Sequence, residues 1–315
     1  MIPLEVQIVL ALVLDLAIGD PVAYPHPVRL MGKLAERLEG PLRRVDASER
    51  LCGVVLVLGV LSVSGICAAA LLAVCAAVHP LAGDAASIIV LYTTFAAKDL
   101  RTHSLRVFRS LQAGDITQAR LDVGQMVSRD TRSMDQQEVI RAGVESVAEN
   151  TVDGVTAPLF FAALAGPVGA IVYKAANTLD SMYGYTSGPF IRFGWASARL
   201  DDLLTWLPAR ITALMAVPAA ALCSLSAKDA WRVFLRDRNR HASPNAGQVE
   251  AAVAGALQVQ LGGGGRYFGQ TVHKPVLGDQ VQSLNPGHIL RVNRLTAIIL
   301  GLTAAVLLAA RAAIV

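Results

Sequence analysis

LCGVVLVLGVLSVSGICAAALLAVCAAV, residues Leu51 to Val78, is an apolar stretch without a single charged side chain. A helix needs about 20 mostly apolar residues to cross the hydrocarbon core of a bilayer. This stretch exceeds that length, so it predicts a membrane-spanning helix. It also predicts that the bilayer governs the fold of the rest of the chain.

Several other segments have a similar character. We expect membrane spans at residues 2–19, 51–78, 85–97, 203–227 and 295–315. The segment 85–97 is short and can continue into the next loop, and 203–227 is interrupted by Pro208, Arg210 and Pro218. Residues 156–176 are apolar but contain Gly166-Pro167 at their centre, so we expect a broken or re-entrant helix there.

The composition agrees with a membrane protein. The 315 residues are 54% hydrophobic and 17% charged, whereas soluble domains carry about 25% charged residues. We find no strand alternation and expect an all-α, polytopic integral membrane protein, folded as one membrane-integrated domain over residues 1–315. The first segment lacks the basic region and cleavage site of a signal peptide, so we expect it to be retained.

The charge and the cysteines exclude other classes. The net charge of +4 is spread over several loops, so no nucleic-acid-binding arm is expected. The four cysteines lie in apolar runs without a CxxC motif, which argues against disulfides and a zinc site.

Polar stretches separate the apolar ones. Residues 20–50, 98–153 and 228–294 hold six, eight and nine Lys or Arg, a bias that predicts a cytoplasmic location. The stretch 177–202 has only Arg192 and Arg199, so the charge bias does not place it. It lies outside if 156–176 and 203–227 both span the membrane, and inside if these segments are re-entrant or buried in protein, which we favour. We expect the catalytic loops to be 98–153, 177–202 and 228–294.

ESVAENTVDGVTAP, from Glu145 to Pro158, places Glu145, Glu149 and Asp153 at four-residue intervals. Ser133 and Gln136 have the spacing of a capping box for the helix that carries them. On one helix face, neighbouring carboxylates would repel by about 3 kcal/mol at an effective dielectric constant near 20. An Mg²⁺ ion held by these oxygens would relieve the repulsion. A solvated polar face is the alternative.

Other polar clusters flank the apolar segments. Charged residues there are costly unless they line a polar site, and Arg and Lys bind phosphate as a fork and as a point charge. The clusters are Arg129, Asp130 and Arg132; Lys174, Asn177 and Asp180; and Arg199, Asp201 and Asp202.

Three further stretches are weaker candidates. LGGGGRYFG, with Arg266, either binds phosphate through its amides or is a flexible loop tip. HASPNAGQVEAAVAGAL places Asn245 at a helix N-terminus, which suits anions, with Glu250 one turn later. His26 and Arg29 follow the first span, where a histidine is often structural. No classical nucleotide-binding motif is present.

In this order, the blocks resemble the CobD/CbiB family of adenosylcobinamide-phosphate synthases. The matching stretches are GDPVAYPHPVRLMGKL, SRDT, ESVAENTVDGVTAPLFFAALAGPVGAIVYKAANTLDSMYGY, FGWASARLDDLLTWLPARITAL and HASPNAGQVEAAVAGALQVQLGG. They cover most of the chain up to about Gly269. GGGGRYFG departs from the looser glycine-and-tyrosine loop of the family.

The resemblance implies an ATP-dependent amide synthase of cobalamin biosynthesis. Its substrates would be adenosylcobyric acid and (R)-1-amino-2-propanol phosphate, or ethanolamine phosphate. The product would be adenosylcobinamide phosphate. It implies the inner membrane, an active site facing the cytoplasm and association with other enzymes of cobalamin biosynthesis.

We assign roles to the candidate residues on that premise. Catalysis would involve Glu149, Lys174, Asp201 and Asp202, with either aspartate orienting the amine or accepting its proton. Mg²⁺ would be held by Glu145, Glu149, Asp153 and Asp180. Substrate and phosphate groups would contact His26, Arg29, Arg129, Arg132, Asn177, Arg199, Asn245 and Arg266. A membrane transporter and an AmpE-like regulatory membrane protein are the alternative functions.

Overall fold

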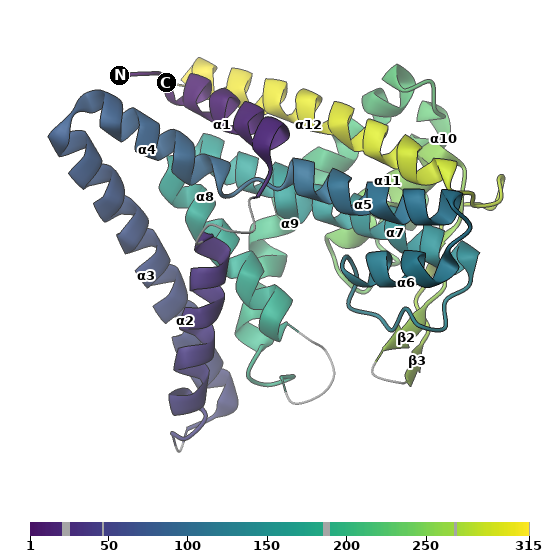
Figure 1. The fold of residues 1–315 in the computed structure, drawn as a ribbon, viewed down its shortest axis with the longest axis horizontal. Coiled ribbons are helices and arrows are strands. Elements are labelled where there is room, and N and C mark those ends of the chain that lie inside the picture. Colours follow the sequence, from purple (N-terminus) through teal and green to yellow (C-terminus); the bar gives the residue numbers. More distant parts are fainter. Residues whose placement is uncertain (21–25, 46, 185–189, 268–269, 315) are drawn as a thin grey trace. The chain divides into compact units, whose positions relative to one another are not determined.

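Helices form most of the chain in the computed structural model, which describes residues 1–20, 26–45, 47–184, 190–267 and 270–314 (Figure 1). The α-helices are α1 (Leu4–Ile18), α2 (Pro27–Leu42), α3 (Glu49–Val78), α4 (Pro80–Tyr92), α5 (Ala97–Gln112), α6 (Ile116–Gly124), α7 (Gln136–Thr151), α8 (Ala157–Tyr183), α9 (Trp195–Leu222), α10 (Ala227–Asp237), α11 (Ala246–Leu257) and α12 (Gly287–Ile314). A π-helical turn, η1 (Val152–Thr156), joins α7 to α8.

Strands are short. Within the described residues they are β1 (Leu261–Gly262), β2 (Gly265–Tyr267), β3 (Gln270–Val272) and β4 (Val276–Leu277). The first pairs with the fourth and the second with the third, both antiparallel. Helices therefore determine the fold, which confirms the expected all-α class.

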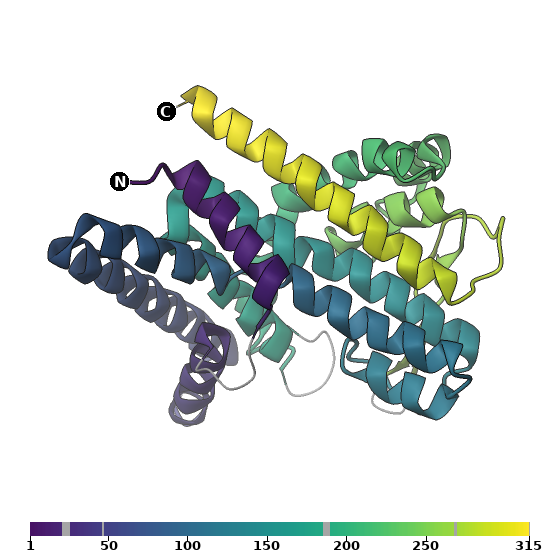
Figure 2. The same ribbon diagram turned by 45° about the horizontal axis from the view of Figure 1, so that its top comes forward.

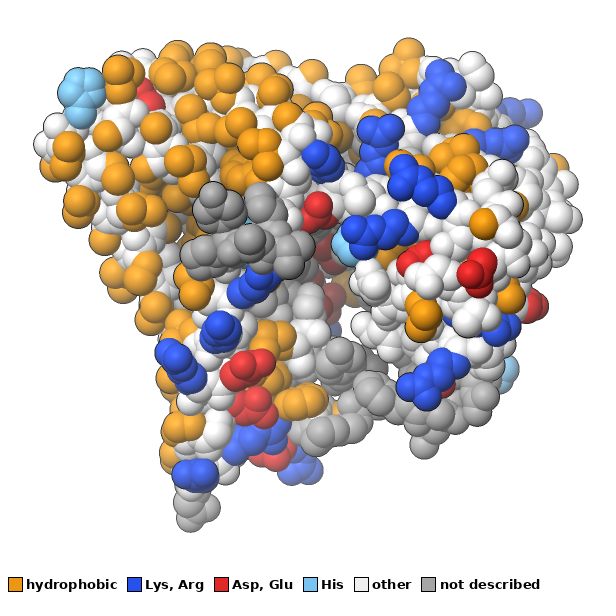
Figure 3. Space-filling view, viewed as in Figure 1, with side chains coloured by type: hydrophobic (Ala, Val, Ile, Leu, Met, Phe, Trp, Pro, Cys, Tyr) orange, Lys and Arg blue, Asp and Glu red, His pale blue; other side chains and the backbone are white. Residues whose placement is uncertain are grey.

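Among the residues that the structure describes, five helical stretches are long and apolar enough to cross a bilayer: Glu49–Val78, Pro80–Gln112, Gln136–Tyr183, Trp195–Leu222 and Gly287–Ile314. Large hydrophobic side chains are exposed along α1, α3 and α4, where hydrophobic atoms cover the surface in Figure 3. Leu58 and Ile66, for example, are 60% and 67% exposed. An apolar surface of this kind is stable in lipid. The protein is thus a polytopic membrane protein.

The first predicted membrane span, residues 2–19, is a shorter helix in the structure than a full crossing requires. Helix α1 has 15 residues, fewer than the about 20 that a full crossing needs. Its polar residues also face inward, because Gln7 and Asp15 are buried. Gln7 Nε2 donates to Asp84 Oδ1 at 3.1 Å, and the Ile2 amide donates to Asp84 Oδ2 at 2.9 Å, which ties the N-terminus to α4.

The chain divides into two compact units, each described here by itself. Unit 1 comprises residues 1–96, 157–205 and 307–315, and unit 2 comprises residues 97–156 and 206–306. In unit 1, α3 and α4 form a hairpin at His79, whose Nδ1 accepts the Leu81 amide and caps α4 (Figure 1). The core packs α2 and α3 against α8 through Met31, Leu56 and Leu179.

Helix α8 reverses direction near its middle. Ala165 and Gly166 leave the helical conformation, Gly166 with a φ of 66°, which is the left-handed region that glycine adopts without steric cost. On a straight helix Phe161 and Tyr173 would lie about 18 Å apart. Their rings instead stack with centroids 5.0 Å apart. The chain therefore turns back at Gly166-Pro167, which confirms the broken or re-entrant helix.

Unit 2 is built around α7. Asp135 caps this helix by accepting the Glu138 amide, and Glu138 accepts the Asp135 amide in return, both at 2.8 Å. The predicted capping box at Ser133 and Gln136 was therefore wrong by two residues. The Asp135 side chain accepts one of the free amides of the first turn, that of Glu138, so the helix begins at Gln136.

Other helices of unit 2 surround α7. Helix α12 lies along α5, which Figures 1 and 2 both show, and Ser104 Oγ donates to Asn293 Oδ1 at 3.0 Å. Helix α11 is buried over its whole length and packs against α10 and α7. Because α11 has no face towards solvent, the elements packed around it hold its side chains in place.

Candidate functional site

Glu145 is the buried acid of α7, with 4% of its surface exposed. Its Oε2 accepts from Arg129 at 2.5 Å, and its Oε1 accepts from the Gly262 amide at 2.7 Å. Gly262 adopts a φ of 81°, and a β-carbon there would lie 2.2 Å from the Pro275 carbonyl oxygen. Only glycine therefore allows this amide to approach Glu145, and the loop becomes part of the site.

Glu250 on α11 is a second buried acid, with 4% exposed. Burial, and then the charges of Glu145 and Glu149, raise the pKa of Glu250 well above its usual range, while Lys274 and Arg129 oppose the shift. Unit 2 thus gathers three carboxylates and two cations near one another. Two buried acids with a strongly shifted pKa beside further charges are typical of functional sites.

His241 belongs to the same cluster. Burial, and then the charge of Lys274, lower the pKa of His241, although Glu149 and Glu145 oppose this. Its Nδ1 accepts the Ser243 amide at 3.0 Å. The lowered pKa favours the neutral imidazole, and a neutral ring whose Nδ1 accepts carries its proton on Nε2.

The three acids of the predicted row occupy different surroundings. Glu145 is buried, Glu149 is exposed and Asp153 is half-buried. The π-helical turn begins at Val152, and its wider turn removes Asp153 from the four-residue register of an α-helix. Arg129 supplies the charge compensation of Glu145 for which Mg²⁺ was invoked.

The fit to Mg²⁺ can be tested on this geometry. Oxygen donors suit the ion, but both oxygens of Glu145 already accept hydrogen bonds. Within the described residues no three His, Cys, Asp or Glu side chains are arranged to hold a metal ion. Glu145, Glu149 and Asp153 therefore do not form a ready-made metal site by themselves.

Unit 1 contains a separate polar cluster between α8 and α9. Asp201 is 8% exposed and accepts from Asn177 Nδ2 at 3.3 Å and from Thr205 Oγ1 at 3.4 Å. The Thr205 hydroxyl also pairs with the Tyr173 hydroxyl at 3.2 Å. Asp201 is thus fixed in place by hydrogen bonds without an arginine among these partners.

The other predicted residues of α8 and α9 are more accessible. Asp202 lies 3.7 Å from Arg199 Nη1, with side chains 31% and 69% exposed. Lys174 and Asp180 are half-buried on α8. An ion pair with an exposed arginine contributes little to stability, and the Arg199 side chain is accessible to a ligand.

The remaining predicted residues have local roles. His26 caps α2 by accepting the Val28 amide at 3.3 Å, and its Nε2 lies 3.4 Å from Asp20 Oδ1. Asn245 is buried at the start of α11, where Arg210 Nη1 lies 3.5 Å from its Oδ1. Arg29 and Arg132 are exposed. Arg266 lies on β2, and its side chain is outside the described residues.

The candidate residues divide between the two units. Unit 2 holds Arg129, Arg132, Glu145, Glu149, Asp153, Asn245 and Arg266; unit 1 holds His26, Arg29, Lys174, Asn177, Asp180, Arg199, Asp201 and Asp202. The structure brings Arg129 to Glu145 and Asn177 to Asp201. The sequence-based assignment omitted His241, Glu250, Gly262 and Lys274. Sequence analysis singled out the stretches that contain the first three, HASPNAGQVE and LGGGGRYFG, without giving these residues a role, whereas nothing in the sequence around Lys274 points to a site.

The chain is similar to known proteins of one family over nearly its whole length. The family described as CobD/Cbib protein matches residues 8–296. A cobalamin biosynthesis protein CobD of Geobacter metallireducens is 48% identical over 87% of this chain and 86% of its own length. A CobD of Desulfotalea psychrophila is 43% identical over 92% and 93%, and a cobalamin biosynthesis protein CbiB of Salmonella typhi is 42% identical over 96% of each chain. No solved structure matches the chain.

Proposed function

The chain belongs to the CobD/CbiB family of cobalamin biosynthesis proteins, and on this premise we propose that it is an ATP-dependent amide synthase. It joins adenosylcobyric acid to (R)-1-amino-2-propanol O-phosphate, or to ethanolamine phosphate, and forms adenosylcobinamide phosphate. The observation that carries the proposal is the buried cluster of Arg129, Glu145 and Glu250 in unit 2. Its residues come from the blocks that the chain shares with the family.

The reaction requires that a carboxylate oxygen becomes a leaving group. In the proposed course the substrate carboxylate attacks the γ-phosphorus of ATP, and ADP departs. The amine then attacks the acyl carbon of the acyl phosphate, inorganic phosphate leaves and a nitrogen-bound proton is lost. Phosphoryl transfer of this kind depends mainly on positioning and charge neutralisation.

The cations of the chain would bind the anionic groups. Arg199 and Lys174 in unit 1 and Arg132 in unit 2 are accessible enough to contact phosphate. Arg129 instead holds Glu145 and thereby the Gly262 loop. Bound Mg²⁺ would neutralise part of the charge of the nucleotide phosphates, with Glu149 as the acid best placed to contact it.

The acids of α9 would handle the amine. An ammonium group must lose a proton before its nitrogen can attack. Asp202 is partly exposed, so it is accessible to an amine and suits this role. Asp201 is held by Asn177 and Thr205 and is better suited to orient the ammonium group.

The proposal places the protein in the inner membrane with its active site towards the cytoplasm, where ATP and the corrinoid occur. Association with other enzymes of cobalamin biosynthesis would let a large amphipathic corrinoid pass between membrane-bound steps.

One experiment tests the function directly. Purified protein in lipid nanodiscs is incubated with adenosylcobyric acid, the aminoalcohol phosphate, ATP and Mg²⁺, and the product is identified by mass spectrometry. We expect adenosylcobinamide phosphate to form in step with ADP. Cells that lack the protein should accumulate adenosylcobyric acid and recover when cobinamide is supplied. A transporter or a regulatory protein would give neither result, and either failure would refute the synthase assignment.

A further inference from the structure

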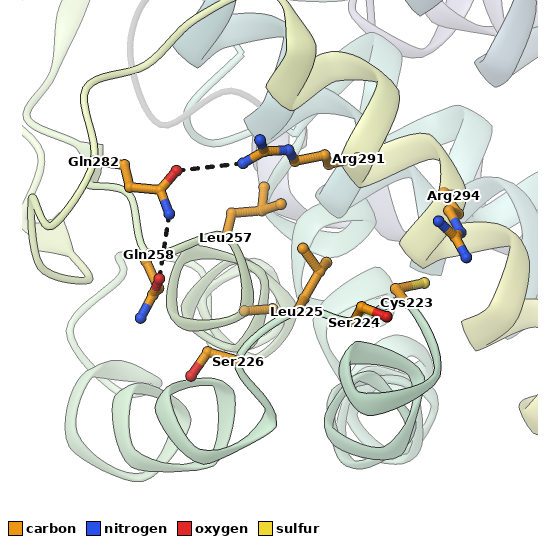
Figure 4. A pocket seen from close by; sticks show the side chains of 10 residues that line it. Cys223, Ser224, Leu225, Ser226, Leu257, Gln258, Gln282, Arg291 and Arg294 are labelled. Carbon is orange, nitrogen blue, oxygen red and sulfur yellow. Dashed lines mark hydrogen bonds between the residues drawn. The ribbon is translucent and has the colours of Figure 1, made fainter.

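A cavity of about 350 Å³ in unit 2 lies between the turn that follows α9 and the first turns of α12 (Figure 4). This volume is near the lower end of the roughly 300–1,000 Å³ of small-ligand pockets. Arg291 and Arg294 line it from α12, and Leu225 and Leu257 contribute apolar surface. The residues that line it include no acid. The cavity therefore combines positive charge with an apolar wall.

Arg291 is positioned by a chain of hydrogen bonds. Its Nη1 donates to Gln282 Oε1 at 3.3 Å, and Gln282 Nε2 donates to Gln258 Oε1 at 3.2 Å, as the dashed lines in Figure 4 show. Gln258 Nε2 in turn donates to Asp229 Oδ2 at 2.8 Å. The guanidinium group has five N–H donors, so one bond to a neutral amide leaves most of them for a ligand.

Arg294 lies one helical turn further along α12. It is exposed, and within the described part of the chain it has no hydrogen-bond or salt-bridge partner. Its positive charge is therefore not neutralised by the protein. Figure 4 shows the guanidinium groups of Arg291 and Arg294 pointing to different parts of the cavity, so the two side chains together make its interior positive.

The surroundings of the cavity identify the kind of ligand. The stretches Trp195–Leu222 and Gly287–Ile314, which are both able to span a membrane, end next to it. Leu222 and Leu290 are exposed at these ends, by 61% and 41%. The cavity therefore lies where the apolar surface of α12 begins beside polar residues, which is the depth of lipid head groups if α12 spans the membrane.

We propose that this cavity binds the phosphate of an anionic phospholipid, with Arg291 contacting the phosphate oxygens, Arg294 adding positive charge and the glycerol backbone lying against Leu225. A phosphate with an apolar chain matches both the charge and the wall. A corrinoid macrocycle is too large for this volume. The site is distinct from the Glu145 cluster, so it stands or falls independently of the proposed reaction.

The test measures which lipids the full-length protein retains. Protein in detergent is incubated with mixed micelles of phosphatidylglycerol and phosphatidylcholine, and bound lipid is counted by native mass spectrometry. The wild type should retain phosphatidylglycerol preferentially. The double variant R291Q/R294Q should bind it about 30-fold more weakly, because each cation near an anionic lipid contributes about fivefold. R291K/R294K should keep part of the affinity, since lysine retains the charge but not the fork.

Controls separate this site from general attraction. R106Q/R109Q removes two exposed arginines of α5 that do not line the cavity, and it should retain lipid as the wild type does. Thermal unfolding of each variant checks that the fold is intact. Equal lipid retention by R291Q/R294Q and R106Q/R109Q would overturn the proposal. Complete displacement of the lipid by millimolar inorganic phosphate would show that the ligand is a free phosphate and refute the lipid assignment.

Discussion

At the scale of single residues, an acidic side chain can be buried only where other groups compensate its charge. Glu145 is buried and needs both Arg129 and the Gly262 amide, whereas Glu149, one turn later on α7, is exposed. Removing one partner of a buried ion pair is costly because the other charge stays buried. An exposed carboxylate carries no such cost, so it remains available for a ligand.

Arg129→Gln should strongly destabilise the protein. The substitution leaves the buried Glu145 carboxylate without its cation, and we expect a loss of about 3–5 kcal/mol in the free energy of unfolding. Chemical unfolding in detergent, followed by intrinsic fluorescence, measures it. Arg132→Gln, which removes an exposed arginine of the same loop, should change stability by less than about 0.5 kcal/mol. Equal stabilities for the two variants would show that the ion pair is not structural.

Glu149→Gln should lower synthase activity without lowering the stability of the fold. Because Glu149 is exposed, its loss should leave thermal unfolding unchanged. Synthase turnover should fall by about 100-fold if its charge helps hold the metal and nucleotide. Glu36→Gln, at an exposed position of α2, is the matched control. Near-normal turnover in E149Q would remove Glu149 from the site.

At the scale of elements, the reversal of α8 and the burial of α11 determine where side chains can meet. The turn at Gly166-Pro167 brings the first arm of α8 back along the second, so that Phe161 stacks on Tyr173. Tyr173 then reaches Thr205, which holds Asp201. The reversal thereby contributes to the position of an acid on α9.

Gly166→Ala should weaken the α8 hairpin. The residue has a φ of 66°, which costs an L-residue about 1–2 kcal/mol. We expect a loss of that size in the free energy of unfolding, measured by denaturant titration. Gly40→Ala in α2 is the control, because a β-carbon there meets nothing within 4 Å. Alanine favours helix at that position, so G40A should be neutral or stabilising. A G166A protein as stable as G40A would contradict the structure.

The stability of the protein depends on pH through Asp229, which lies in the first turn of α10. Hydrogen bonds from Ser226, Gln258 and Arg232 lower the pKa of Asp229 to about 2, below an unfolded value of about 3.9. The ionised form is thus favoured by folding. Its stabilising effect is complete above about pH 4 and is lost as the pH falls towards 2.

Thermal unfolding of the wild type between pH 5 and pH 2.5 tests this dependence. The midpoint should fall across that range, and Asp229→Asn should show a smaller fall because the titrating group is absent. Ser226→Ala, which removes the first of the hydrogen bonds, should lie between them. Parallel curves for wild type and D229N would exclude Asp229 as the cause.

At the scale of the whole molecule, the reversal of α8 determines topology. If residues 156–176 turn back, the stretch 177–202 lies on the same side of the membrane as the loop 98–153. The α3–α4 turn at His79 lies at the far end of a 30-residue apolar helix and should face the opposite side.

Cysteine labelling tests this topology. In a variant lacking the four native cysteines, Arg192→Cys and Ser133→Cys should react with a membrane-impermeant maleimide from the same side. His79→Cys should react only from the other. All three positions are exposed. If Arg192→Cys reacts together with His79→Cys, the hairpin does not keep 177–202 on the side of the catalytic loops.

Much of the fold could be predicted because bilayer energetics act on local sequence. Apolar stretches such as Leu51–Val78 become helices wherever they occur, and glycine followed by proline interrupts a helix regardless of its neighbours. The sequence did not identify the N-cap of α7, because the side-chain oxygens of Ser133 and Asp135 can both accept a backbone amide. In the structure Asp135 is the cap, because its carboxylate accepts the Glu138 amide and its own amide donates to Glu138.

For the site, residue types could be predicted but not partners. The sequence by itself determined that acids and cations accompany the apolar segments, since that follows from composition and helical spacing. Only the tertiary structure decided that Arg129 neutralises Glu145, that Gly262 and Glu250 join the cluster from more than 100 residues away, and that Arg291 and Arg294 share a cavity. The physical reason is that ion pairs, desolvation and cavities depend on distances between segments, and the chain order does not encode those distances locally.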